Sequence, residues 1–127
     1  MKLAHARIVT DDVPKLTKFY RDVTGMTPEG DERYVEFHGP TMALAISSQR
    51  MIDLHSRGAA APRLNGSMIL DFEVADVDAE RARLAPIARE FVREPTTQPW
   101  GNRSMLFRDP DGNLINMYAV VRTPAQA

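Results

Sequence analysis

The stretch that decides the fold runs from Trp100 to Tyr118 and reads WGNRSMLFRDPDGNLINMY. Residues 102–108 and 114–121 on either side of its centre are rich in strand-forming residues. The DPDGN segment between them is turn sequence, because proline presets φ, aspartates bond the local backbone and Gly112 tolerates positive φ. The stretch therefore predicts a β-hairpin.

Composition limits the classes of protein that the chain can belong to. Its 127 residues are 43% hydrophobic and 26% charged, which is ordinary for one globular domain with a real core. A net charge of −1 gives no electrostatic reason to expect nucleic acid or an anionic membrane as partner. The absence of cysteine excludes disulfides, thiolate nucleophiles and cysteine-bound metals.

The N-terminal residues MKLAHAR contain charges that interrupt any signal-peptide core. No apolar run approaches the roughly 20 residues that a membrane-spanning helix needs. We therefore expect a cytoplasmic protein that binds neither membrane nor nucleic acid.

Outward from the hairpin, the chain alternates between strand patterns and two helical patterns. A helix is predicted to begin after Asp12 and end at Gly25, with an apolar stripe at helical spacing. A second is predicted over 79–85, after an aspartate cap and before Pro86. The remaining elements are expected strands at 3–10, 27–31, 33–37, 42–47, 67–74 and 88–92, and a loop at 95–99.

The second half of the chain repeats the order of the first. Residues 8–13 align with 72–77, and 33–40 with 103–110, a strand leading to a capped helix and then to a strand meander. This predicts an α+β domain of two modules, each a strand, a helix and three strands. The expected boundaries are 1–48 for module one, 49–66 for an irregular connection, 67–122 for module two and 123–127 for a tail.

Four segments resemble the vicinal oxygen chelate superfamily, which includes glyoxalase I, bleomycin-resistance proteins and extradiol dioxygenases. They are AHARIVTDD (4–12), FYRDVTGM (19–26), LDFEVADVD (70–78) and FRDPDGNLI (107–115). The resemblance covers almost the whole chain. It implies two βαβββ modules related by a pseudo-twofold axis, each curled into a half-open cup, and leaves the chemistry undefined.

The resemblance also implies four positions at which metal-dependent members hold a divalent ion. Here they carry His5, Ile46, Ile69 and Asn116, with one residue of slippage from Ile46 toward Ala45 or Ser47. Isoleucine cannot ligate, and neutral asparagine is a poor ligand for a transition metal. The resemblance therefore points to a metal-free branch with no cofactor, and a divalent metal is the less favoured alternative.

Strand alternation predicts which side chains line the cup. The inward-facing residues are His5, Arg7, Val9, Met42, Leu44, Ile46, Ile69, Asp71, Glu73, Leu114, Asn116 and Tyr118. An apolar cup with a few convergent polar groups is typical of a small-molecule site. In the alternative interpretation, Arg7 and Asp71 pair with each other across the pseudo-twofold axis.

Individual residues carry more specific hypotheses. His5 is expected to hydrogen-bond within the cup, for example to Asn116, or to act as a general acid or base. Trp100 is expected either to stack on a planar ligand at the mouth or to fill the cup or a subunit contact. Asn102 and Arg103 are candidates for polar contacts with that ligand. His38 and His55 are not expected to face the cup.

Two functions follow from these expectations. The first is a homodimeric protein that binds a small aromatic or planar molecule in a metal-free cup at the dimer cleft. The alternative is an enzyme of the same superfamily, a lyase, isomerase or dioxygenase-like protein, that uses His5 with or without a divalent metal. A member of the superfamily without any ligand is a third possibility.

Overall fold

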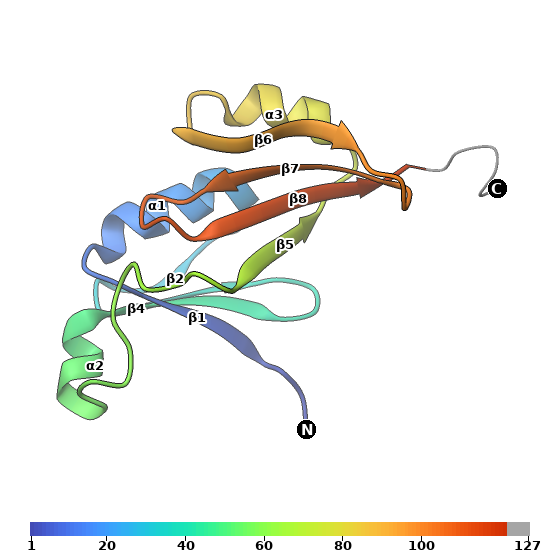
Figure 1. The fold of residues 1–127 in the computed structure, drawn as a ribbon. Coiled ribbons are helices and arrows are strands. Elements are labelled where there is room, and N and C mark those ends of the chain that lie inside the picture. The colour runs from blue at the N-terminus through green and yellow to red at the C-terminus, as the bar shows by residue number, and fades with distance from the viewer. Residues whose placement is uncertain (122–127) are drawn as a thin grey trace. The chain divides into compact units, whose positions relative to one another are not determined.

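In the computed structural model, which describes residues 1–121, the chain divides into two compact units. One comprises Met1–Asn65 and the other begins at Gly66. Each unit contains one four-stranded sheet and an α-helix between its first and second strands (Figure 1).

The first unit consists of β1 (His5–Thr10), α1 (Val13–Thr24), β2 (Glu29–Gly30), β3 (Tyr34–His38), β4 (Ala43–Ser48) and α2 (Gln49–His55). Its sheet has the order β1-β4-β3-β2, in which β1 and β4 are parallel and the other pairs are antiparallel. The parallel pair brings the two ends of the module together in the sheet.

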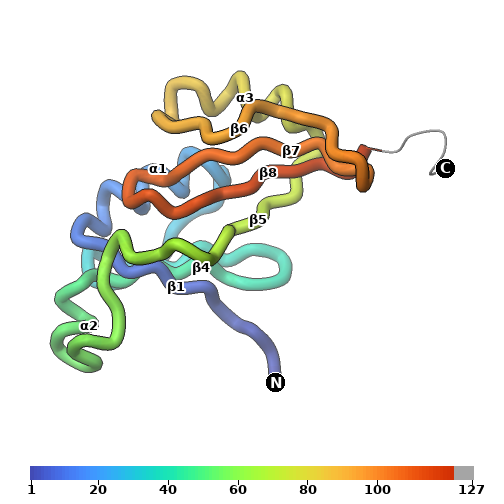
Figure 2. The backbone as a smooth tube through the Cα atoms, viewed as in Figure 1, coloured from blue at the N-terminus to red at the C-terminus, as the bar shows by residue number. Residues whose placement is uncertain are grey.

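The second unit consists of β5 (Ile69–Glu73), α3 (Val77–Leu84), β6 (Glu90–Thr97), β7 (Asn102–Arg108) and β8 (Leu114–Val120). Its sheet has the order β5-β8-β7-β6, again with a parallel pair, β5 and β8, and antiparallel pairs elsewhere. Both units have the same order of elements, a strand, a helix and three strands, and the first unit continues into α2 (Figure 2). The predicted α+β fold of two βαβββ modules is confirmed.

Local sequence explains the ends of α1. The Asp12 side chain accepts a hydrogen bond of 3.1 Å from the Lys15 amide, which is the expected N-cap. Gly25 has φ of 71° and donates from its amide to the Arg21 carbonyl, as a left-handed C-cap does. Between these caps the helix buries its apolar stripe, which comprises Val13, Leu16, Phe19, Tyr20 and Val23.

Two secondary-structure predictions were wrong. Residues 49–55, expected to be irregular, form α2, because the Ser48 hydroxyl accepts from the Met51 amide and caps a helix only seven residues long. The loop expected at 95–99 is strand as far as Thr97. Pro95 is tolerated there because β6 is an edge strand whose pairing with β7 is irregular between Arg93 and Thr96.

The hairpin predicted over residues 102–121 is present as β7 and β8. Its loop is organised by the Asp109 carboxylate, which is 5% exposed and accepts from the amides of Asp111 and Asn113 at 2.9 Å each. The Asn113 side-chain amide donates a third bond of 2.7 Å. Gly112 completes the turn with φ of 86°.

The helices described in residues 1–121 include none with the length and apolar content needed to span a membrane.

Candidate functional site

Each sheet has two faces, and strand register assigns every side chain to one of them. In the first sheet, Val35, Phe37, Leu44 and Ile46 share a face and are buried. α1 contacts β3 and β4 of this sheet. The opposite face carries His5, Arg7, Glu29, Tyr34, Glu36 and His38, and we call it the Glu36 face.

This register corrects the predicted positions of Leu44 and Ile46. Both lie on the face opposite His5, and Ile46 is fully buried. The reason is the length of the hairpin loops. His38 pairs with Ala43, five residues later, whereas the equivalent Arg108 pairs with Leu114, six residues later. Counting six residues from each loop proline therefore misplaces the residues of β4 by one position. Because side chains alternate along a strand, this error assigns each β4 side chain to the wrong face of the sheet.

The counterpart of Asn116 in the first unit is consequently Ala45. Asn116 pairs with Asp71 in β5, and Ala45 pairs with Arg7, the residue equivalent to Asp71. Ala45 was the first alternative considered for slippage at this position.

On the Glu36 face, three polar side chains contact the carboxylate of Glu36. The Tyr34 hydroxyl donates to Glu36 Oε2 at 2.7 Å, and His5 Nε2 lies 3.0 Å from the same oxygen. His38 Nε2 lies 3.1 Å from Oε1 and 3.8 Å from Glu29 Oε2. The Tyr34 hydrogen bond, followed by the two histidines, lowers the pKa of Glu36. Burial, followed by the bond to Glu36, raises the pKa of Tyr34.

Sequence reasoning missed Glu36 and placed His38 outside the site. The signal that finds them is strand alternation from β3, because Tyr34, Glu36 and His38 are two residues apart and are less buried than Val35 and Phe37 between them. His55 lies in α2, outside the sheet. The hydrogen bond of His5 to Asn116 and the Arg7–Asp71 pair would join the two units and stay predictions.

The second sheet carries the Asn116 face, which we define by Ile69, Asp71, Leu106, Leu114, Asn116 and Tyr118. Asn116 Nδ2 donates to Asp71 Oδ1 at 2.9 Å, and the Tyr118 hydroxyl lies 3.4 Å from Glu73 Oε1. The nearby Glu73 charge is the main cause that raises the pKa of Tyr118. Ile115, Met117 and Ala119 on the opposite face are buried, as strand alternation predicts.

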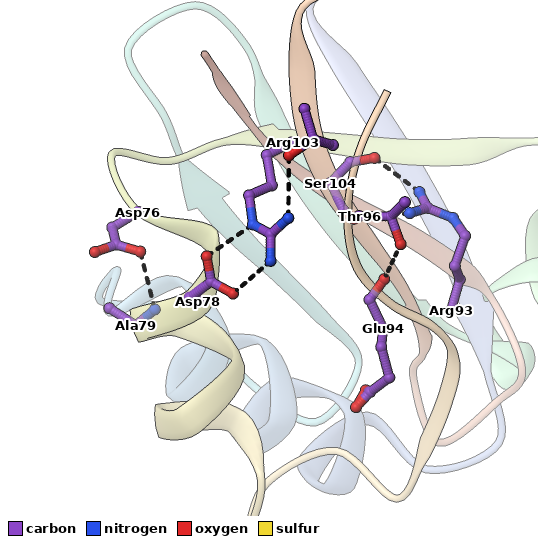
Figure 3. Close-up of polar contacts among 9 residues, drawn as sticks. Asp76, Asp78, Ala79, Arg93, Glu94, Thr96, Arg103 and Ser104 are labelled. Atoms are coloured by element: carbon purple, nitrogen blue, oxygen red, sulfur yellow. Dashed lines mark hydrogen bonds and ion pairs between the residues drawn. The ribbon is translucent and has the colours of Figure 1, made fainter. Parts of the chain in front are cut away.

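The residues predicted at the mouth separate onto different surfaces. Asn102 pairs with Val120 on the Asn116 side of the sheet, whereas Arg103 pairs with Ala119 on the opposite side. Figure 3 shows Arg103 reaching Asp78 at the start of α3, where two hydrogen bonds of 2.8 and 2.9 Å hold it. Trp100 lies in the loop before β7 and is 69% exposed.

One further cation borders the Asn116 face. Arg93 in β6 pairs with Leu106 and donates to the Ser104 carbonyl at 2.8 Å and to its hydroxyl at 2.7 Å (Figure 3). The irregular pairing of β6 hid this residue from sequence reasoning, because alternation cannot be counted through a bulge.

The residues at the implied metal positions do not fit a divalent ion. After correction of the register they are His5, Ala45, Ile69 and Asn116, which offer one imidazole and one neutral amide. Within residues 1–121, no group of three or more histidine, aspartate or glutamate side chains is arranged to hold a metal ion.

The chain forms two βαβββ units with the same strand order. In each unit one face of the sheet is buried and the other carries polar or mixed side chains. This is the paired-module fold that the sequence predicts. Residues 2–117 match the model of the Glyoxalase/Bleomycin resistance protein/Dioxygenase superfamily, so the chain belongs to this superfamily.

Individual proteins are similar to the chain over most of its length. The uncharacterized protein YaeR of Escherichia coli (strain K12) is 32% identical over 123 residues, covering 90% of this chain and 92% of YaeR. The uncharacterized protein YraH of Bacillus subtilis (strain 168) is 27% identical over 128 residues, covering 95% of this chain and all of YraH. A glyoxalase/bleomycin resistance protein/dioxygenase family enzyme from Burkholderia phytofirmans PsJN has a TM-score of 0.84 at 15% identity, with 95% of this chain and 100% of that chain covered, and shows the fold alone.

Proposed function

We propose that this protein binds a small planar or aromatic molecule on the Asn116 face, without a metal and in a cleft completed by a second copy of the chain. The observation that carries the proposal is the Asn116–Asp71 hydrogen bond of 2.9 Å. Because Asn116 uses a side-chain N–H there, its carbonyl oxygen and the second Asp71 oxygen remain as acceptors. A ligand with an amine or ring N–H matches them.

The surroundings of this pair suit the flat body of such a ligand. Ile69, which is 49% exposed, and Leu106 and Leu114 beside it offer apolar contact on the same face. A few polar groups among apolar side chains are typical of small-molecule sites. Val120 lies about 13 Å along β8 from Asn116, and Trp100 comes two residues before Asn102, the partner of Val120. A span of at least this length matches a molecule of several fused rings.

The dimer is supported by apolar residues that remain exposed near this face. Trp100 is 69% exposed and Val120 60% exposed, and side chains of this kind commonly mark interaction surfaces. The protein is expected to sediment as a dimer, and a monomeric mass at working concentration would contradict this part of the proposal. A cytoplasmic location stays a prediction.

Titration calorimetry with 9-aminoacridine, a planar molecule with an exocyclic amine, tests the proposal. We expect saturable binding accompanied by quenching of Trp100, the only tryptophan. Asn116→Leu should weaken binding about tenfold, since it removes one acceptor and releases Asp71 from its orientation.

Arg103→Gln is the matched control, because Arg103 is held by Asp78 on the other side of the sheet. It should bind the probe as the wild type does. Absence of saturable binding, or equal affinity in Asn116→Leu, would refute a ligand site on the Asn116 face.

An enzyme that uses His5 is the second candidate function. It is favoured by one specific contact, the 3.0 Å approach of His5 Nε2 to Glu36, because a carboxylate that holds an imidazole is a common arrangement for acid–base chemistry.

A further inference from the structure

The Glu36 face contains a connected group of polar side chains that binding at the Asn116 face does not use. Its centre is the Glu36 carboxylate. Tyr34 and His38, from the same strand, and His5, from β1, contact this carboxylate. β1 and β3 are not neighbours, because β4 lies between them. The contact between His5 and Glu36 therefore crosses a strand.

Small residues in β4 make that crossing possible. Alternate strands of a sheet are about 10 Å apart, too far for most side chains to meet over a bulky residue. On this face β4 presents Ala43 and Ala45, which pair with His5 and with Glu36 respectively. Because these methyl groups are short, the histidine and the glutamate can approach each other above them.

The contact determines which nitrogen of His5 is available. The Tyr34 hydrogen bond, followed by the two histidines, keeps the pKa of Glu36 low, so the carboxylate is ionised at neutral pH and only accepts hydrogen bonds. A neutral His5 ring therefore carries its proton on Nε2 and its lone pair on Nδ1. Among the residues of the first unit, 1–65, Nδ1 of His5 has no hydrogen-bond partner.

Arg7 adds a positive charge to the same face, two residues from His5 along β1. Its guanidinium makes no hydrogen bond or ion pair with the other residues of the first unit, 1–65. It lies close enough to oppose the increase in the pKa of Tyr34 that burial causes. Across the sheet, Arg7 pairs with Ala45, Ala45 with Glu36, and Glu36 with Glu29. Glu29 is therefore at the other end of this line of paired residues from Arg7. Within the first unit, a guanidinium and an imidazole nitrogen without partners therefore lie on the same sheet face. This combination is suited to an anion formed by loss of a proton.

We propose that the Glu36 face binds a weakly acidic phenol and accepts its proton. His5 Nδ1 takes the proton, Arg7 binds the phenolate oxygen, and Glu36 is the positioning residue that orients the ring. The ligand O–H bond breaks, an N–H bond forms at Nδ1, and the positive charge on the ring faces the Glu36 carboxylate. This inference rests on the second candidate function and uses only contacts within the first unit.

The test uses 4-nitrophenol, whose phenolate ion absorbs visible light and whose neutral form does not, at a pH below the pKa of the free probe. The wild-type protein should increase the phenolate absorbance saturably. Glu36→Gln should reduce the equilibrium for proton transfer about tenfold, because a charge-assisted bond to the protonated ring is lost. Arg7→Gln should raise the Kd of the probe about tenfold.

His5→Gln should abolish the increase in absorbance while leaving the Tyr34–Glu36 hydrogen bond intact, so it carries the test even if Glu36→Gln fails to fold. His55→Asn removes an imidazole from α2 and should behave as the wild type. The inference is overturned by the absence of a saturable increase, or by an increase that survives in His5→Gln.

Discussion

Replacement of Ile46 with alanine is expected to lower the free energy of unfolding by about 3 kcal/mol. Ile46 is fully buried in β4, on the same face as Val35, Phe37 and Leu44. Removal of three of its carbon atoms loses apolar burial and leaves a cavity in a core where neighbouring side chains cannot fully relax. Urea denaturation of the wild type and the variant measures the difference directly.

The matched control is the same substitution at Ile69. Simple counting from the motifs gives Ile46 and Ile69 equivalent roles in one cup, whereas the structure leaves Ile69 49% exposed on an edge strand. Ile69→Ala should therefore cost about 1 kcal/mol or less. Equal losses at the two positions would contradict the strand register on which both polar faces depend.

Replacement of Asp109 with alanine is expected to lower the free energy of unfolding by about 2 to 3 kcal/mol. The Asp109 carboxylate accepts from two backbone amides and from the Asn113 side chain at 2.7–2.9 Å. The residue is 5% exposed, so water cannot easily replace these bonds. The substitution leaves buried donors without an acceptor, which is the costly form of hydrogen-bond loss. Thermal and urea denaturation both measure the effect.

Asp111 in the same loop is the control for this prediction. One of its carboxylate oxygens is buried without a hydrogen-bond partner among the described residues. Its amide, which donates to Asp109, is retained in Asp111→Ala. The variant should change stability by no more than about 1 kcal/mol. If Asp111→Ala is as damaging as Asp109→Ala, charge in the loop rather than the bonds of Asp109 sustains the hairpin.

The fold was predictable because its signals are local and repeated. The DPDGN loop, the Asp12 cap and the Gly25 stop each act through neighbouring backbone groups, and the structure contains all three. The strand order common to both sheets follows from the repeat of these signals. α2 was missed because a seven-residue helix rests on one cap, Ser48, and has little periodicity to detect.

The faces of the candidate site were predictable only where the alternation of side chains along a strand could be counted from a turn of known length. In β8, counting alternate residues from the hairpin loop puts Asn116 and Tyr118 on one face of the sheet and Ile115 and Met117 on the other. The structure agrees, because Ile115 and Met117 are buried. In β4 it failed, because the first hairpin loop is one residue shorter than the second. Alternation in β3 places Glu36 on the polar face, but its contact with His5 crosses β4, and no spacing along the chain encodes that contact.

The central proposal is that this member of the superfamily binds its ligand without a metal. Calorimetric titration of the untagged protein with Zn²⁺ and Ni²⁺ tests this proposal most directly. The chain should show no saturable binding of either ion, because the implied positions provide one imidazole and one neutral amide. Stoichiometric binding of one ion per chain that disappears in His5→Ala would contradict the account.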